Sequence, residues 1–251
     1  MNPSSIRFFT FAAPSRFYWL AGLLTPWLWA ATIALSVAGL YIGFFVAPTD
    51  ATQGDSYRII FIHVPAAWMA MVLYLVMAGW AAIGWAFKAK LAAMVARAIA
   101  PTGAMFTFVA LWTGAFWGKP TWGTWWVWDA RLTSMLILLF LYLGFIALVE
   151  AIDDTRRGDQ AGALLALIGA VNVPIIYFSV KWWNTLHQGA SINASGSKMA
   201  ATMLLSMLIM TFAFWAYGFA AVFTRTRAII LEREQHADWV GKLVGREGAR
   251  A

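Results

Sequence analysis

Residues 59–87, IIFIHVPAAWMAMVLYLVMAGWAAIGWAF, form an apolar run without a single charged side chain. A helix needs about 20 apolar residues to cross a bilayer. Backbone N–H and C=O groups have no water to bind inside lipid, so a long apolar segment there must be helical. The run also lacks the alternation of apolar and polar residues that marks a strand. It therefore predicts a transmembrane helix and an all-α integral membrane protein.

Five more charge-free runs of similar length lie along the chain. Together with the first they predict a bundle of six transmembrane helices, and Asn172 with Pro174 predicts a kink in the fifth. We divide the chain into an interfacial N-terminal segment at 1–26, a six-helix membrane domain at 27–225 and a charged tail at 226–251. The predicted spans cover residues 27–47, 59–87, 98–117, 132–149, 160–180 and 199–224.

The composition fits this class of protein and excludes several functions. Of 251 residues, 62% are hydrophobic and 12% are charged, whereas soluble domains carry about 25% charged residues. The absence of cysteine excludes disulfides, thiol catalysis and thiolate metal ligands. The net charge of +7 comes without a nucleic-acid-binding motif, so we attribute it to basic residues that flank membrane spans.

The distribution of lysine and arginine predicts how the chain is oriented in the membrane. With a cytoplasmic N-terminus, thirteen of the eighteen basic residues fall in inner segments and five in outer ones. Cytoplasmic segments beside spans carry the excess of positive charge, so both termini are predicted to be cytoplasmic. The inner residues are Arg7, Arg16, Lys88, Lys90, Arg97, Arg156, Arg157, Arg225, Arg227, Arg233, Lys242, Arg246 and Arg250, and the outer ones are Arg58, Lys119, Arg131, Lys181 and Lys198.

The connection between the third and fourth spans, residues 117–131, reads WGKPTWGTWWVWDAR and is predicted to lie on the outer side. Gly118, Pro120 and Gly123 interrupt regular structure, so we predict a shaped loop or a short surface helix. Its indoles have large aromatic faces and could form a platform for a large, flat, apolar ligand. Anchoring at the lipid headgroups is the alternative. The five tryptophans are Trp117, Trp122, Trp125, Trp126 and Trp128.

Two of the three histidines are predicted to lie on the same side as these tryptophans. His63 stands at the outer start of the second span, with Pro65 expected in its first turn, and His187 follows the fifth span. Two neutral imidazoles from separate segments can supply both axial ligands of a haem iron. Zinc is less favoured because no third ligand is evident, and interfacial hydrogen-bonded histidines are the alternative. The third histidine, His236, lies in the charged tail.

Charged residues near the tryptophans would complete such a site. Arg58 and Arg131 stand at the same boundary, and the planar guanidinium of arginine matches the carboxylates of a porphyrin. Attraction to lipid phosphate explains these two arginines equally well. Asp129 is expected to cap the fourth span, to hold Arg131 or to orient an indole, and the sequence leaves these three roles open.

The residues from Trp122 to Asp129, WGTWWVWD, resemble the tryptophan-rich signature of the WWD family of haem-handling proteins in cytochrome c maturation. Six spans in a chain of this length, with one outer histidine on each side of the signature, resemble the CcmC group, the haem exporter protein C family, within it. The resemblance covers essentially the whole chain. Larger WWD proteins have more spans and additional histidines, which are missing here.

The resemblance implies a function. CcmC-like proteins bind haem b at the outer, periplasmic face of the bacterial inner membrane and present it to the haem chaperone CcmE. They work with the CcmA/CcmB ABC transporter and the small subunit CcmD. His63 and His187 would be the axial ligands of the iron. The platform would comprise Trp117, Trp122, Trp125, Trp126, Trp128 and Asp129, with Arg58 and Arg131 as flanking basic positions.

We therefore expect a haem carrier that is not itself an enzyme. The sequence has no Walker A motif, so any ATP hydrolysis that drives the process would take place in a partner protein. One alternative is an electron-transfer protein with haem inside the membrane, although apart from His63 the spans hold no histidine. A second alternative is an assembly subunit that binds no haem and uses its tryptophans to anchor itself and to dock partners.

Overall fold

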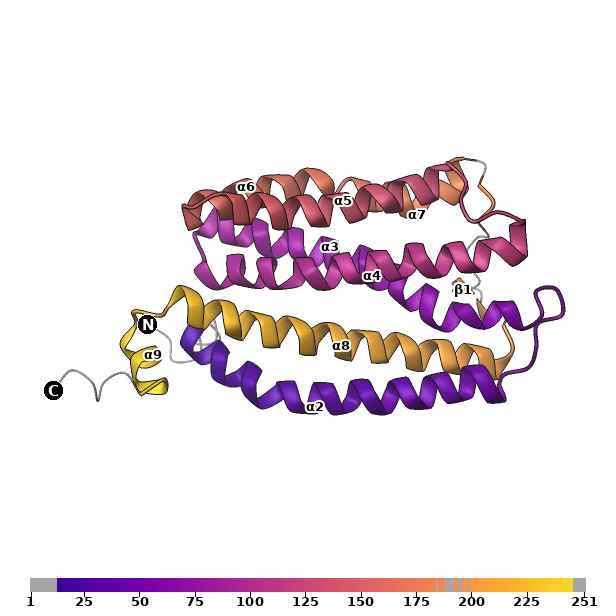
Figure 1. The fold of residues 1–251 in the computed structure, drawn as a ribbon, viewed down its shortest axis with the longest axis horizontal. Coiled ribbons are helices and arrows are strands. Elements are labelled where there is room, and N and C mark those ends of the chain that lie inside the picture. Colours follow the sequence, from indigo (N-terminus) through magenta and orange to yellow (C-terminus); the bar gives the residue numbers. More distant parts are fainter. Residues whose placement is uncertain (1–12, 184, 188–191, 194–195, 198, 246–251) are drawn as a thin grey trace.

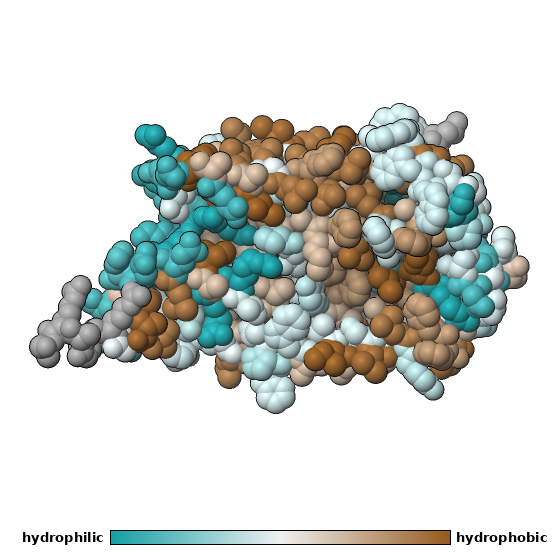
Figure 2. All heavy atoms as spheres, in the orientation of Figure 1, coloured by the Kyte–Doolittle hydropathy of each residue, from teal (hydrophilic) through white to brown (hydrophobic). Residues whose placement is uncertain are grey.

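Within the residues that the structure describes, six spans that are long and apolar enough to cross a membrane make up the fold, as the apolar runs predicted. The described chain begins and ends at the same end of the bundle, which six crossings require (Figure 1). Figure 2 shows apolar side chains across the middle of the molecule and hydrophilic ones gathered toward its ends. The computed structural model describes residues 13–183, 185–187, 192–193, 196–197 and 199–245, so Arg7, Lys198, Arg246 and Arg250 of the charge count lie outside it.

The elements follow the predicted order of spans. The first span is α2, Pro14–Tyr41, which a π-helical turn continues at Ile42–Val46. A 3₁₀ turn, Asp55–Ile59, leads into α3, Ile60–Phe87. The remaining elements are α4 (Lys90–Trp122), α5 (Ala130–Ala151), α6 (Thr155–Gly169), α7 (Asn172–Trp182), the paired antiparallel strands β1 (Ile192–Asn193) and β2 (Gly196–Ser197), α8 (Ala201–Arg233) and α9 (Asp238–Leu243).

The first and last spans are longer than their apolar runs. Helix α2 begins at Pro14 and is continuous across the boundary that we predicted at residue 26. Proline suits the first turn of a helix because its missing N–H would have no partner there. Helix α8 likewise continues past residue 225 to Arg233. Helix ends therefore do not coincide with the ends of the apolar runs.

The tryptophan-rich stretch is only partly a loop, which corrects the prediction for residues 117–131. Helix α4 runs on through Pro120 to Trp122. It ends because Gly123 adopts a left-handed conformation with φ 78°, which glycine tolerates without strain, and its N–H donates to the carbonyl of Lys119 at 3.0 Å. The non-helical part of the stretch is therefore residues 123–129, and Trp117 and Trp122 sit on a helix.

The fifth span is interrupted, as Asn172 and Pro174 predicted. Helix α6 ends at Gly169 and α7 begins at Asn172, so Pro174 falls in the first turn of the second helix. The side-chain amide of Asn172 donates to the carbonyl of Ser134 on α5 at 2.8 Å. This bond ties the interruption to the neighbouring span and aims α7 toward the tryptophan-rich end (Figure 1).

Helices α3 to α7 form one group, and α2 lies along α8 beside it (Figure 1). Small residues let α3, α4 and α5 approach closely. A Cβ atom at Gly103 of α4 would lie 2.1 Å from the ring of Tyr142 of α5, so only glycine fits there. The hydroxyl of Tyr142 donates to the carbonyl of Ala70 on α3 at 2.8 Å and so links all three helices.

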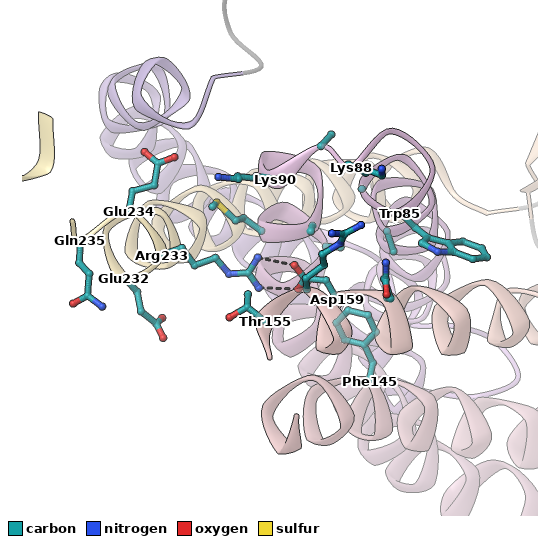
Figure 3. Close-up of a pocket in the computed structure, with 18 residues that line it drawn as sticks. Trp85, Lys88, Lys90, Phe145, Thr155, Asp159, Glu232, Arg233, Glu234 and Gln235 are labelled. Carbon is teal, nitrogen blue, oxygen red and sulfur yellow. Dashed lines mark hydrogen bonds and ion pairs between the residues drawn. The ribbon is translucent and has the colours of Figure 1, made fainter. Parts of the chain in front are cut away.

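An ion pair joins α8 to this group at the end where the described chain starts and finishes. The guanidinium of Arg233 donates to both carboxylate oxygens of Asp159 on α6 at 2.7 and 2.8 Å (Figure 3). The pair lies at the wall of a cavity of about 660 Å³. None of the predicted haem-site residues lines this cavity.

Candidate functional site

His63 and His187 lie side by side, although 124 positions separate them in sequence (187 − 63). His63 comes from α3 and His187 from the connection that follows α7. Their ring centroids are 6.3 Å apart and the ring planes are inclined by 42°. The two histidines that the sequence placed on the same side of the membrane thus form a pair.

The ring of His63 is held between α3 and α4. Helical structure begins at Asp55, so His63 and Pro65 lie deeper in the helix than the first turn in which we expected the proline. The Nδ1 atom of His63 is 3.0 Å from Oγ1 of Thr113 on α4. A Cβ atom at Gly114 would lie 3.0 Å from Cε1 of His63, so the ring rests directly against the helix backbone.

The ring of His187 has a free nitrogen in a buried position. Its Nδ1 atom is buried and has no hydrogen-bond partner among the described residues. Burial lowers the pKa of His187 to about 4, with the nearby Arg131 acting in the same direction and Asp129 against it. The imidazole is therefore neutral near pH 7 and keeps a lone pair that a metal ion can accept.

Asp129 connects the tryptophan-rich stretch to His187. One carboxylate oxygen of Asp129 accepts from the N–H of Leu132 at 2.8 Å and caps α5, which was one of the roles left open. The other oxygen accepts from the hydroxyl of Thr185. The Thr185 oxygen in turn accepts from the backbone N–H of His187 at 3.1 Å. The carboxylate thereby fixes the start of α5 and the segment that carries His187.

The two arginines of the prediction have different surroundings. Arg131 lines the small cavity between His63 and His187, and its guanidinium makes no hydrogen bond or ion pair within the described part of the chain. Arg58 is already engaged: it donates to the carbonyls of Gly43 and Ala47 at 2.6 and 3.0 Å, and to the carboxylate of Asp55 at 2.9 Å. The guanidinium of Arg131 thus has no partner among the described residues, whereas that of Arg58 satisfies the carbonyls at the end of the first span.

Two of the five tryptophans contact the histidine pair, and the other three make other ring contacts. Trp117 lies edge-on to His63, with ring centroids 5.6 Å apart, and Trp122 lies 5.1 Å from His187. Trp125 packs against Phe116, away from the histidine pair. The remaining two, Trp126 and Trp128, contact each other at 5.4 Å, and the indole N–H of Trp126 is buried without a partner among the described residues.

A small apolar cavity lies beneath the two imidazoles. Its volume is about 40 Å³, roughly that of one water molecule. No group of three or more histidine, cysteine, aspartate or glutamate side chains that could hold a metal ion occurs within the described ranges. The apolar lining comes from Ala67, Met71, Ala110, Leu111, Met135 and Ile176.

Sequence reasoning missed the residues that hold the site in place. Thr113 and Gly114 contact His63, Thr185 binds Asp129, and Gln53 accepts from the indole N–H of Trp117 at 2.7 Å. Thr113 carries a usable signal, because it precedes Trp117 by four positions and so shares a helix face with it. The polar partners on the connecting segments carry no such signal.

The chain is similar to known proteins over nearly its whole length. A family model described as Heme exporter protein C matches residues 7–241. The Heme exporter protein C of Escherichia coli (strain K12) is 47% identical over 239 residues, which cover 95% of this chain and 97% of the relative. That of Bradyrhizobium diazoefficiens is 50% identical over 206 residues, or 81% and 77%. A putative cytochrome c biosynthesis ccmC-like mitochondrial protein of Marchantia polymorpha is 43% identical over 197 residues, or 78% and 84%.

Proposed function

The chain belongs to the haem exporter protein C family, and from this membership we propose that it holds haem b between His63 and His187 and presents it to a periplasmic partner. The family places the chain in haem delivery for cytochrome c maturation. The multi-pass membrane character of the six spans agrees with such a role. We assign the protein to the bacterial inner membrane, with both termini in the cytoplasm and the histidine pair at the periplasmic face.

The histidine pair is the observation that carries the proposal. Metal–imidazole bonds are about 2.0–2.1 Å long, so two of them end to end span about 4 Å. The ring centroids of His63 and His187 are 6.3 Å apart. Once the two metal–nitrogen bonds are subtracted, about 2 Å in total remains for the distances from each ring centroid to its own nitrogen. The spacing therefore matches a single metal ion held by both imidazoles. Iron supplies the acceptor for the two lone pairs when haem is bound.

The surroundings of the pair suit the rest of a haem molecule. Arg131 has a free guanidinium that can bind a propionate through paired hydrogen bonds. Trp117 and Trp122 flank the imidazoles and offer aromatic edges and faces to the porphyrin. Trp125, Trp126, Trp128 and Asp129 complete the proposed platform, while Arg58 acts by holding the end of the first span.

An energy comparison separates the contributions of stacking and ligation. If tryptophans cover on the order of 300 Å² of porphyrin, burial contributes about 7–8 kcal/mol. Association itself costs about 4–15 kcal/mol. Stacking alone thus holds haem weakly, and the two iron–nitrogen bonds supply much of the net affinity. Such a balance suits a carrier, because loss of one axial ligand is enough to release the cargo.

The partners follow from the same assignment. We propose that the chaperone CcmE receives the haem, and that the chain works in a complex with the CcmA/CcmB ABC transporter and the small subunit CcmD. ATP would be hydrolysed by the transporter, because this chain has no Walker A motif. In this account the protein binds and hands over haem without catalysing a reaction, so it is not an enzyme.

The absorption spectrum of the purified protein tests the proposal. Wild type should show the spectrum of six-coordinate haem with two histidine ligands. The variants His63→Ala and His187→Ala should lose most of their haem, whereas His236→Ala, which alters the histidine outside the site, should keep it. Full haem occupancy and an unchanged spectrum in both site variants would refute axial ligation. Reduction by quinol with catalytic turnover would favour an electron-transfer protein instead.

A further inference from the structure

We propose that Thr113 is a positioning residue that fixes which nitrogen of His63 faces the haem iron. The inference rests on the proposed function, since it concerns the same site. Thr113 lies on α4 and reaches His63 on α3, so it acts on the ligand from a different helix. The family resemblance and the sequence pattern gave it no role, and the assignment comes from three interatomic distances.

The hydroxyl proton of Thr113 is already used within α4. Its Oγ1 atom lies 2.6 Å from the carbonyl oxygen of Val109 and 3.3 Å from that of Ala110. Carbonyl oxygens only accept, and a separation of 2.6 Å is typical of an O–H···O hydrogen bond. If the proton pointed elsewhere, the lone pairs of two oxygens would face each other at that distance. The hydroxyl of Thr113 therefore donates to Val109.

The direction of that bond decides the tautomer of His63. A hydroxyl has one proton and two lone pairs, so Thr113 can only accept from the imidazole nitrogen 3.0 Å away. Nδ1 of His63 must then carry the proton, and Nε2 keeps the lone pair. A neutral imidazole has one donor and one acceptor nitrogen, so this hydrogen bond leaves Nε2 as the ligand atom.

Packing keeps the His63 ring in this orientation. One edge of the ring rests against Gly114, where even a Cβ atom would approach Cε1 to 3.0 Å. The ring of Trp117 lies across it at 5.6 Å with an interplanar angle of 71°. Ligand histidines of metal sites commonly donate their second N–H to an oxygen, which orients the ring and raises its basicity. Thr113 supplies that oxygen here.

His187 has no equivalent side-chain partner. Its Nδ1 is without a hydrogen bond among the described residues, and its backbone N–H is what binds Thr185. Removing the Thr113 hydroxyl should therefore affect one axial ligand and leave the other unchanged. The effect can be separated from a general loss of the site.

A valine substitution tests the assignment, because Thr113→Val keeps the branched shape and removes the hydroxyl. Loss of such an orienting hydrogen bond typically lowers metal affinity about 10–100-fold. We expect this loss when haemin is titrated into the purified full-length protein in detergent, with a shift in the haem absorption spectrum and midpoint potential. Thr113→Ser, which keeps the hydroxyl, should restore both. A serine variant that behaves like the valine variant would overturn the hydrogen-bond assignment.

Thr107→Val is the matched control. Thr107 is buried on the same helix, and its hydroxyl donates to the carbonyl of Gly103 at 2.7 Å, as that of Thr113 does to Val109. Thr107 does not touch either histidine, so its variant should bind haemin like wild type. The haem-free melting temperatures of the two valine variants should be similar. Equal haemin affinity and spectrum in Thr113→Val and Thr107→Val would refute the proposal.

A second measurement does not depend on haem binding. ¹⁵N spectra of histidine-labelled, haem-free protein report which imidazole nitrogen of His63 carries the proton, with His63→Ala identifying the signal. Wild type should show the proton on Nδ1, and a proton on Nε2 would overturn the inference. If this tautomer is found but neither histidine variant changes haemin binding, the proposed function fails while the assignment for Thr113 stands.

Discussion

The segment that carries His187, the proposed haem ligand, is fixed through its backbone, and no side chain of the described residues holds the free Nδ1 of the ring. The backbone of His187 is tied to Thr185, and through it to Asp129, while the imidazole keeps a buried, unpaired nitrogen. An unpaired buried polar atom is costly unless a ligand satisfies it. Among the described residues nothing offsets that cost, and the proposed bond to haem iron would do so.

The lowered pKa of His187 predicts a flat pH dependence of haem binding. A histidine with the ordinary pKa of 6.5 is about 90% protonated at pH 5.5, and its affinity for iron would fall about tenfold between pH 7.5 and 5.5. Because burial lowers the pKa of His187 to about 4, its neutral form persists throughout this interval. Haemin titrations of haem-free protein should give nearly constant affinity. A midpoint near pH 6.5, retained in His236→Ala, would contradict the burial of this ring.

The two arginines should separate ligand binding from stability. Arg131→Gln removes the free guanidinium at the histidine pair and should weaken haemin binding about 10–100-fold, the equivalent of about 1.5–3 kcal/mol for a charged hydrogen bond. Arg58→Gln leaves the carbonyls of Gly43 and Ala47 without their donor and should lower stability by about 1–3 kcal/mol. Melting curves and haemin titrations on both variants check this. The opposite pattern would show that Arg58 is the propionate ligand.

The helices show what hydropathy could and could not predict. Apolar runs located all six spans, because length and the absence of charge suffice to identify a membrane helix. They did not locate helix ends, because these depend on local backbone bonding. Gly123 ends α4 through its left-handed conformation, well after the apolar run. Pro14 starts α2 well before its run, since a polar or charged residue inside a first turn does not stop a helix.

The candidate site, like the helices, could be predicted only in part from the sequence. His63 and His187 could be placed at one end by counting spans, since topology alone fixes the side of each connection. The sequence places Thr113 on the same face of α4 as Trp117, but it does not predict the contact with His63, because that contact depends on the rotation of α3 and α4 about their axes. Charge alone also failed to distinguish Arg58 from Arg131. Arg58 donates to two backbone carbonyls, and Arg131 has no such partners among the described residues.

Loss of the Asp129 cap at the start of α5 should lower haemin affinity by more than the loss of stability would suggest. Asp129→Ala removes the cap of α5 and also frees Thr185, so haemin affinity should fall at least tenfold while stability drops by about 0.5–2 kcal/mol. Asp154→Ala is the matched control, because Asp154 caps α6 by accepting from the N–H of Arg157 at 2.7 Å and does not reach the site. Indistinguishable haemin affinities for the two variants would refute the link between Asp129 and His187.

The molecule as a whole consists of two groups of helices, α3 to α7 and α2 with α8, and α8 also contacts α3 and α4 of the first group (Figure 1). Along its length α8 packs against α2, α3 and α4, and Arg225 of α8 donates to the carbonyl of Ala98 and the hydroxyl of Thr102 on α4 at 2.8 and 2.9 Å. The Arg233–Asp159 pair adds a directional contact to α6 (Figure 3). The side chains are only 12% and 19% exposed, so breaking the pair leaves a charge poorly solvated.

A double-mutant cycle on this pair tests whether it fixes α8 against α6. Arg233→Gln and Asp159→Asn should each lower the stability of the purified protein by about 1–3 kcal/mol, because each single change leaves the other charge without its partner. The double variant should lose less than the sum of the two single losses. Lys242→Gln on α9, which lies outside the pair, should have little effect. The haem spectrum should stay the same in all four proteins, since α7, which leads to His187, lies toward the other end of the bundle (Figure 1). Additive losses of stability would mean that the two side chains stabilise the protein independently. A changed haem spectrum would mean that the position of α8 at one end determines the geometry of the histidine pair at the other.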